Sequence, residues 1–244
     1  SLEIVSIADV PGRSGLGGSS SYAVGVLNAL HFFKRENASR ETLAEEACRL
    51  EIDILKEPIG KQDQYVASFG GINSYEIEKD GTVHVKPLVI SPHTLAELEN
   101  DLLLFYTGMK RDTSRILREH KQDEEKGVKR VIETMHEIKK IGYQVRDSLA
   151  TGDTRTFGEL LDLHWRTKKN LSDRVSNDRI DELYALAKRS GALGGKIMGA
   201  GGGGFFMFYS ENGKETLRKA MTNEGLKEVR FRFDFDGSKT LLNI

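Results

Sequence analysis

The chain has 244 residues, of which 38% are hydrophobic and 30% charged, and its formal net charge is -1. This length suggests one large domain or two small ones, and the balanced charge excludes a general attraction to nucleic acid or to an acidic membrane surface. No apolar run approaches the roughly 20 residues of a membrane span, and no signal peptide is visible. Cys48 is the only cysteine, which excludes a disulfide framework or a zinc pattern and fits a reducing, cytoplasmic compartment.

The first third of the chain predicts a strand, several helices and a hairpin. Residues 2–10 alternate as in a strand, and residues 20–34 are apolar on all sides, which is typical of a buried helix. The stretch "SRETLAEEACRLEIDILK", which starts at Ser39, predicts an amphipathic helix with acidic first turns. A loop, a short helix and a glycine turn follow in "EPIGKQDQYVASFGG", and residues 72–90 predict a hairpin that turns at an Asp-Gly pair.

The rest of the chain predicts long helices between short strands. The stretch "DLLLFYTG" predicts a buried strand, and residues 113–149 are charged and helical, with one break. Two further helices are expected over residues 157–169 and 178–190. At the end, "GGFFMFYS", a helix at residues 214–222 and "KEVRFRFDF" predict a strand, a helix and a strand.

The stretch "GRSGLGGSSS" stands between the first predicted strand and the first predicted helix. A flexible Gly/Ser linker would lead into a polar segment or a new domain, but this one leads straight into an apolar helix. A glycine loop at a helix N-terminus favours an anion, because free backbone N–H groups and the helix dipole attract it. Ser19, Ser20 and Ser21 could contact phosphate or a metal, or cap the helix. The pattern therefore predicts a phosphate loop, with a capped structural turn as the alternative.

Other phosphate motifs do not fit the sequence. The P-loop pattern and the protein-kinase signatures are absent. A literal G-x-G-x-x-G occurs at residues 199–204, but an apolar strand rather than a helix follows it, so the Rossmann context fails.

Two motifs together resemble those of the GHMP kinases, the superfamily of galactokinase, homoserine kinase, mevalonate kinase and phosphomevalonate kinase. "PGRSGLGGSSSY" resembles the motif P-x-x-x-G-L-G-S-S-A-A. "KIMGAGGGGFFMF" resembles the third motif, K-x-[ST]-G-A-G-x-G-G before a strand, with Met198 in place of Ser or Thr. The stretches "GKQDQYVASFGGIN", "HWRTKKNLSDRVSND" and "FYTGMKR" resemble the D-glycero-D-manno-heptose 7-phosphate kinase group. The family's first motif is absent, so we expect a fragment that lacks its first strands and has at most weak activity alone.

The resemblance implies an α+β, two-domain fold. Residues 1–92 would form a ribosomal protein S5-like part and residues 93–244 a ferredoxin-like part, with the active site in the cleft between them. The implied activity is ATP- and Mg²⁺-dependent phosphorylation of a small-molecule sugar or sugar phosphate, with the anomeric hydroxyl of heptose 7-phosphate as the expected acceptor; a homodimer is left open. Another GHMP kinase acting on fucose, galactose or a mevalonate intermediate, and a non-catalytic sugar- or nucleotide-binding relative, are the alternatives.

The resemblance also assigns roles to the residues around the first motif. Asp63, in "KQDQY", matches the catalytic base, and Glu51, twelve residues earlier, matches the metal-binding glutamate. Taken alone, Asp63 is a plausible helix cap and Glu51 an ordinary exposed helical residue. Ser19 matches the serine that binds Mg²⁺ and phosphate. The nucleotide phosphates would be bound by Pro11, Gly15, Leu16, Gly17, Gly18, Ser19, Ser20 and Ser21.

A phosphorylated acceptor needs a cationic pocket, for which the planar fork of Arg suits phosphate better than the point charge of Lys. Arg166 and Lys169 are three residues apart and would share a helix face, and Trp165 could stack on a sugar; an ordinary solvated helix is the alternative. His164 is expected to pack rather than to react. Residues 199–204 hold five glycines in six positions, more than a turn requires. The expected acceptor-binding residues are Gly71, Arg111, Trp165, Arg166, Lys169, Gly199, Ala200 and Gly201.

Overall fold

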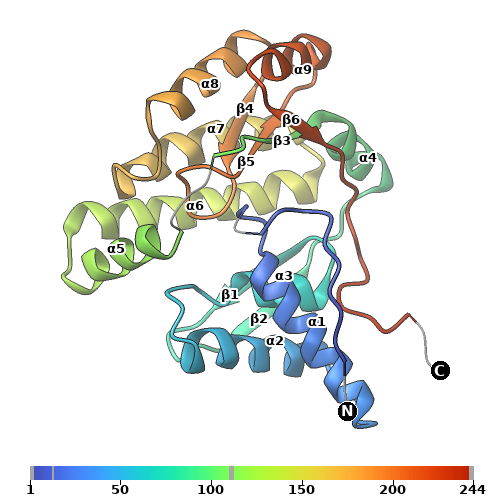
Figure 1. Cartoon of the computed structure of the whole chain (residues 1–244). Helices are drawn as coiled ribbons and strands as arrows, with labels where there is room; N and C mark the ends of the chain where they lie inside the picture. Colours follow the sequence, from blue (N-terminus) through green and yellow to red (C-terminus); the bar gives the residue numbers. More distant parts are fainter. Residues whose placement is uncertain (1–2, 13, 110–112, 242–244) are drawn as a thin grey trace.

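The computed structural model describes residues 3–12, 14–109 and 113–241 and has two stacked parts, shown with the first part below the second in Figure 1. The first part contains three helices, a π-helical turn and a two-stranded hairpin. Their bounds are α1 Gly18–Phe33, α2 Arg40–Cys48, η1 Arg49–Ile54, α3 Gln62–Phe69, β1 Asn73–Ile77 and β2 Val83–Pro87. The expected hairpin is confirmed, with antiparallel pairing from Asn73 opposite Pro87 to Ile77 opposite Val83.

Two predictions for the first part are wrong. Residues 3–8 form no strand and pair with no strand of the described chain, and Ile7 is 92% exposed. Alternation alone does not make a strand, which needs a hydrogen-bonded neighbour. Helix α1 buries one side only: Ala23 and Val24 pack on Leu43 and Ala47 of α2, whereas Phe33 is exposed.

The second part is built on a four-stranded antiparallel sheet in the order β4-β5-β3-β6. Its strands are β3 Leu102–Tyr106, β4 Gly194–Ile197, β5 Phe205–Tyr209 and β6 Lys227–Val229. Long helices separate β3 from β4, a glycine loop joins β4 to β5, and one helix separates β5 from β6. This β-α-β-β-α-β order is the ferredoxin-like arrangement, so the α+β prediction is confirmed. Strand β4 was not predicted, because "GGKI" is short and glycine-rich, and glycine is depleted in strands.

Helices cover both faces of this sheet. They are α4 Pro92–Asp101, α5 Thr113–Glu125, α6 Lys129–Thr151, α7 Thr154–Lys168, the 3-10 turn η2 Lys169–Leu171, α8 Asp178–Arg189 and α9 Lys214–Asn223. The predicted break in the first long helical segment lies between α5 and α6, at Gly127 with a φ of 69°. In the described part of the chain, no helix combines the length and the apolar character needed to cross a membrane.

The core divides according to the two faces of the sheet. Phe105, Phe206 and Phe208 pack with residues of α8 and α9. Leu102 and Tyr209 point to the opposite face and pack with Leu98 of α4, Leu149 of α6, and Phe157 and Leu161 of α7. The period-two alternation of the strands decides which side chain joins which cluster.

After β6 the chain returns to the first part (Figure 1). Asn28 of α1 donates to Ser238 Oγ at 2.9 Å, Arg40 of α2 donates to the Asp236 carbonyl at 3.2 Å, and the Gly71 N–H donates to the Asp234 carbonyl at 2.6 Å. Residues 234–238, which belong to the expected second domain, therefore lie against the first.

Candidate active site

The first glycine loop, residues 11–18, leads directly into α1, as the sequence predicts; Arg13 lies outside the described residues. Gly15 and Gly17 have φ angles of 89° and 67°, in the left-handed region that favours glycine. Gly17 is the N-cap residue and, as a glycine, has no side chain that could cap this end of the helix. The glycine loop and the start of α1 therefore have the form of an anion site at a helix N-terminus.

Asp63 packs directly against this loop. A Cβ atom at Gly17 would lie 3.3 Å from both Cβ and Cγ of Asp63, so the close approach requires glycine. Asp63 is in the first turn of α3 and is exposed. The fold thus brings the candidate base to the start of α1, as the mechanism demands.

Glu51 is a buried carboxylate beside the same helix end. It lies in the π-helical turn η1 and is only 4% exposed. Its Oε2 accepts hydrogen bonds from Ser20 Oγ at 2.7 Å and from Gln64 Nε2 at 2.6 Å. A buried carboxylate needs such donors, because burial without them is costly. The serine that bonds Glu51 is thus Ser20, which points inward, whereas Ser19 is exposed.

The oxygen atoms around Glu51 suit a magnesium ion. Both hydrogen bonds are accepted by Oε2, which leaves Oε1 for a further ligand. The side-chain oxygen of Gln64 is buried and has no hydrogen-bond partner in the described structure. No group of three or more His, Cys, Asp and Glu side chains among the described residues could hold a metal. Mg²⁺ fits this donor set, since it takes oxygen ligands and usually keeps waters and nucleotide phosphates.

The second glycine loop, residues 199–204, is held by backbone contacts. A Cβ at Gly201 would lie 2.7 Å from the Val175 carbonyl, and one at Gly203 would lie 2.9 Å from the Met109 carbonyl. The Gly202 N–H donates to the Val175 carbonyl at 2.9 Å. Five glycines here have positive φ angles, so packing alone explains several of them. The Ala200 methyl is buried, which leaves Gly199 and Gly201 as the candidates for ligand contact.

The prediction that Trp165 stacks on a sugar is wrong. Its ring is fully buried in the core, 6.2 Å from the ring of Tyr184. Arg166 forms an ion pair with Asp162 at 2.8 Å, and Lys169 forms one with Asp181 at 3.1 Å. These two cations are already partly neutralised, and their contact with an acceptor stays a prediction.

Gly71 and Arg111 are the other two predicted acceptor contacts. Gly71 lies under the returning C-terminal segment: its N–H is taken by Asp234, and a Cβ there would lie 3.2 Å from the Phe235 ring. Its amide is therefore already bonded within the chain. Arg111 lies outside the described residues.

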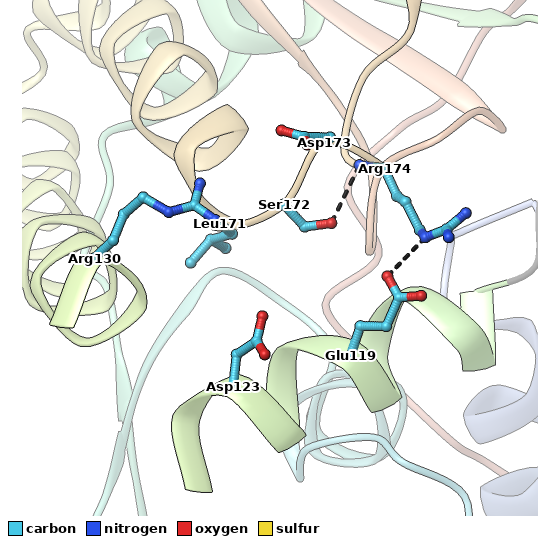
Figure 2. A pocket seen from close by; sticks show the side chains of 7 residues that line it. All are labelled: Glu119, Asp123, Arg130, Leu171, Ser172, Asp173 and Arg174. Carbon is cyan, nitrogen blue, oxygen red and sulfur yellow. Dashed lines mark hydrogen bonds and ion pairs between the residues drawn. The ribbon is translucent and has the colours of Figure 1, made fainter. Parts of the chain in front are cut away.

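A cavity of about 460 Å³ lies between α5 and the loop after η2 and contains none of the predicted residues (Figure 2). Arg174 crosses it to Glu119 on α5, at 2.7 Å. The next residue, Val175, contacts the second glycine loop, so the cavity adjoins that loop. In the sequence, four of its lining residues lie in the stretch "NLSDRVSND", which was used above only for the family resemblance. The cavity is lined by Glu119, Asp123, Arg130, Leu171, Ser172, Asp173 and Arg174.

Comparison with known proteins agrees with this site. Residues 1–71 match the GHMP kinases N terminal domain, and residues 145–227 match the GHMP kinases C terminal domain. The chain is 36% identical to a D-glycero-alpha-D-manno-heptose 7-phosphate kinase of Campylobacter jejuni over 241 residues, which cover 98% of this chain and 70% of that protein.

Solved structures show the same similarity. A putative sugar kinase from Campylobacter jejuni matches with a TM-score of 0.74 at 35% identity, over 94% of this chain and 65% of that one. A D-glycero-D-manno-heptose 1-phosphate kinase from Bacteroides thetaiotaomicron matches with a TM-score of 0.73 at 30% identity, over 94% of this chain and 64% of that one. The chain thus spans about two thirds of the length of each structure. On these matches and this site, the chain belongs to the GHMP kinase family.

Proposed function

We propose that the protein is an ATP-dependent kinase that phosphorylates the anomeric hydroxyl of D-glycero-D-manno-heptose 7-phosphate. The observation that carries the kinase chemistry is the contact of Asp63 with Gly17, at the N-terminus of α1. The heptose acceptor is supported by the 36% identical relative that carries this name.

Phosphoryl transfer from ATP needs positioning, charge neutralisation and a group that orients or deprotonates the nucleophile. The first glycine loop and the α1 N-terminus would bind the nucleotide phosphates through backbone N–H groups. Asp63 packs on Gly17 and would take the proton of the acceptor hydroxyl. Gly199 and Gly201 would border the acceptor, with Arg166 and Lys169 as the proposed outer cations.

Mg²⁺ would be held by Glu51, with Ser20 or Ser19 and the Gln64 side-chain oxygen nearby. When bound, it would offset the negative charge of the phosphates. The hydrogen bonds from Ser20 and Gln64 fix the Glu51 carboxylate in one orientation. We propose a reducing, cytoplasmic setting, with a sugar phosphate as the small-molecule partner, no nucleic acid or membrane partner, and a homodimer left open.

The test is product formation from a panel of acceptors with ATP and Mg²⁺, under conditions that detect slow turnover. The panel contains heptose 7-phosphate, the unphosphorylated heptose, L-fucose, galactose and mevalonate. We expect heptose 7-phosphate to be preferred. Asp63→Asn should lower kcat by about 10² or more while ATP still binds, since general base catalysis contributes typically 10²–10⁴-fold.

Asp53→Asn is the matched control, because Asp53 is an exposed carboxylate in the same π-helical turn as Glu51. It should leave turnover unchanged. An unphosphorylated sugar as the best acceptor would refute the heptose 7-phosphate assignment, and full activity of Asp63→Asn would refute the catalytic one.

A further inference from the structure

Helix α7 and strand β4 run side by side, with contacts at both ends. A Cβ at Gly194 would overlap the carbonyl oxygen of Gly158, and the Lys168 ammonium donates to the Gly199 carbonyl. The ten residues from Gly158 to Lys168 rise about 15 Å along a helix. The five residues from Gly194 to Gly199 span about 16 Å of extended chain. The two segments therefore stay in step along their length.

Between these end contacts, His164 and Lys196 lie at nearly the same level. His164 is about 9 Å along the helix from Gly158, and Lys196 is about 7 Å along the strand from Gly194. After burial, the charge of Lys196 is the next largest cause that lowers the pKa of His164, as this placement implies.

The side chains of both residues point to the same side of the sheet. A single stripe of α7, at spacings of four, three and four residues, carries Phe157, Leu161, His164 and Lys168. Phe157 and Leu161 belong to the apolar cluster that includes Met207. Lys196 is the cross-strand partner of Met207, and such partners point to the same face. Lys196 and His164 thus extend this apolar cluster toward the second glycine loop.

Both side chains are half-buried and lack partners in the described structure. Within the described residues, the Lys196 ammonium has no acidic partner and no hydrogen bond, and Nδ1 of His164 is buried without a partner. Burial lowers the pKa of Lys196 to about 8, so the group is still mostly protonated at pH 7. Burial, followed by the charges of Lys196 and Lys168, lowers the pKa of His164 to about 3, so its ring is neutral. A charge removed from water is costly unless it is paired, so a half-buried cation without an acidic partner, beside an unused ring nitrogen, favours the binding of an anion.

We propose that Lys196 and His164 form a phosphate subsite beside the second glycine loop, and that it binds the phosphate group of the acceptor. This rests on the proposed function. Arg166 and Lys169 already have Asp162 and Asp181 as partners, whereas Lys196 has no acidic partner among the described residues. The ammonium would donate to one phosphate oxygen, and the Nδ1–H tautomer of His164 would donate to another. The proposed site for the nucleotide phosphates is a different one, at the start of α1 in the other part of the molecule.

The test measures the binding of heptose 7-phosphate, unphosphorylated heptose, inorganic phosphate and ATP separately, by calorimetry. Lys196→Met should weaken the binding of heptose 7-phosphate and of inorganic phosphate about ten- to a hundredfold, which is the effect of one charge-assisted hydrogen bond. The same substitution should change the affinity for ATP less than twofold. Lys196→Arg should retain part of the phosphate affinity that Lys196→Met loses. His164→Asn, which keeps a hydrogen-bond donor, should bind the two phosphate ligands better than His164→Leu. Lys227→Met, on an exposed lysine of β6 in the same sheet, should change nothing.

Each outcome decides between the possibilities. If Lys196→Met binds inorganic phosphate and heptose 7-phosphate as the unaltered protein does, the subsite is refuted. If only ATP weakens, the cation serves the nucleotide and the acceptor assignment is refuted. If the unaltered protein binds inorganic phosphate through Lys196 but not heptose 7-phosphate, the subsite stands and the proposed acceptor fails. NMR of the lysine side chain gives a second readout, because bound phosphate should raise the pKa of Lys196.

Discussion

The hydroxyl of Ser20 donates to the Glu51 carboxylate at 2.7 Å, with both side chains buried. This bond links the first turn of α1 to the π-helical turn after α2. It fixes the orientation of the one buried carboxylate near the phosphate loop among the described residues. Ser20, the neighbour of the expected metal-binding residue Ser19, therefore orients the Glu51 carboxylate by a hydrogen bond within the protein.

Replacement of Ser20 by Ala should lower stability more than replacement of its exposed neighbours. The lost bond leaves a buried carboxylate with one donor fewer, which costs about 1–3 kcal/mol. Ser19→Ala and Ser21→Ala, both at exposed positions, should each change the free energy of unfolding by less than about 0.5 kcal/mol. Urea unfolding of the three variants measures the difference, and equal stabilities would contradict the structural role of Ser20.

The Mg²⁺ dependence of turnover distinguishes the roles of Ser19 and Ser20. A serine that contacts the ion should, when replaced by Ala, raise the Mg²⁺ concentration for half-maximal rate. We expect the larger rise for Ser19→Ala if the exposed hydroxyl binds the ion directly, and for Ser20→Ala if orientation of Glu51 dominates. No rise in either variant would remove both from the metal site.

Gly17→Ala should damage the site through Asp63. The added Cβ would lie 3.3 Å from the Asp63 side chain, and the φ of 67° is strained for alanine. We expect a loss of about 1–2 kcal/mol in stability and a fall in kcat with little change in the KM for the acceptor. Gly25→Ala is the matched control, because Gly25 lies inside α1 with open space around it. That variant should be stabilised by about 0.5–1 kcal/mol.

Acid should destabilise the fold through His164. Its pKa is about 3 in the folded protein and 6.5 as the usual value. Between these values the unfolded chain binds the proton and the folded chain does not, so stability falls as the pH drops from 6.5 toward 3. The slope from this residue is at most about 1.4 kcal/mol per pH unit. Carboxylates titrate in the same window, so the measurement is the difference between the unaltered protein and His164→Gln, whose unfolding free energy should depend less on pH.

Much of the secondary structure was predictable because it is encoded locally. The hairpin follows from alternation around an Asp-Gly turn, and the break between α5 and α6 coincides with a glycine. Strand β4 was not predictable in this way, because its glycines are required by tertiary contacts. A side chain at Gly194 would clash with α7, and one at Gly195 would clash with the Phe208 ring. Residues 3–10 show the converse error: their alternation predicts a strand, but they pair with no strand in the described part of the chain.

The candidate site was predictable by motif but not in its details. The motifs indicated Asp63 and Glu51, and the fold brings both to the start of α1. Which serine donates to Glu51 depends on the residue at which α1 begins, and a shift of one residue would change it. Trp165 was misassigned because its helical spacing does not reveal which face α8 covers. The ion pair of Lys169 with Asp181 joins two helices, so spacing within one segment could not indicate it. The ion pair of Arg166 with Asp162 joins residues four apart on one helix, so spacing could have indicated it.

The returning C-terminal segment should depend on Arg40. Its guanidinium donates to the Phe69 carbonyl at 3.1 Å and to the Asp236 carbonyl at 3.2 Å, so it joins α3 to the segment. Arg40→Ala removes both bonds, and we expect faster hydrogen exchange and proteolysis around residues 234–241, with a loss of about 0.5–1.5 kcal/mol per bond as an upper range. Arg49→Ala, an exposed arginine that continues the same helical stretch, should leave the segment protected. Equal exchange rates in the two variants would mean that Asn28, Gly71 and the remaining contacts hold the segment without Arg40.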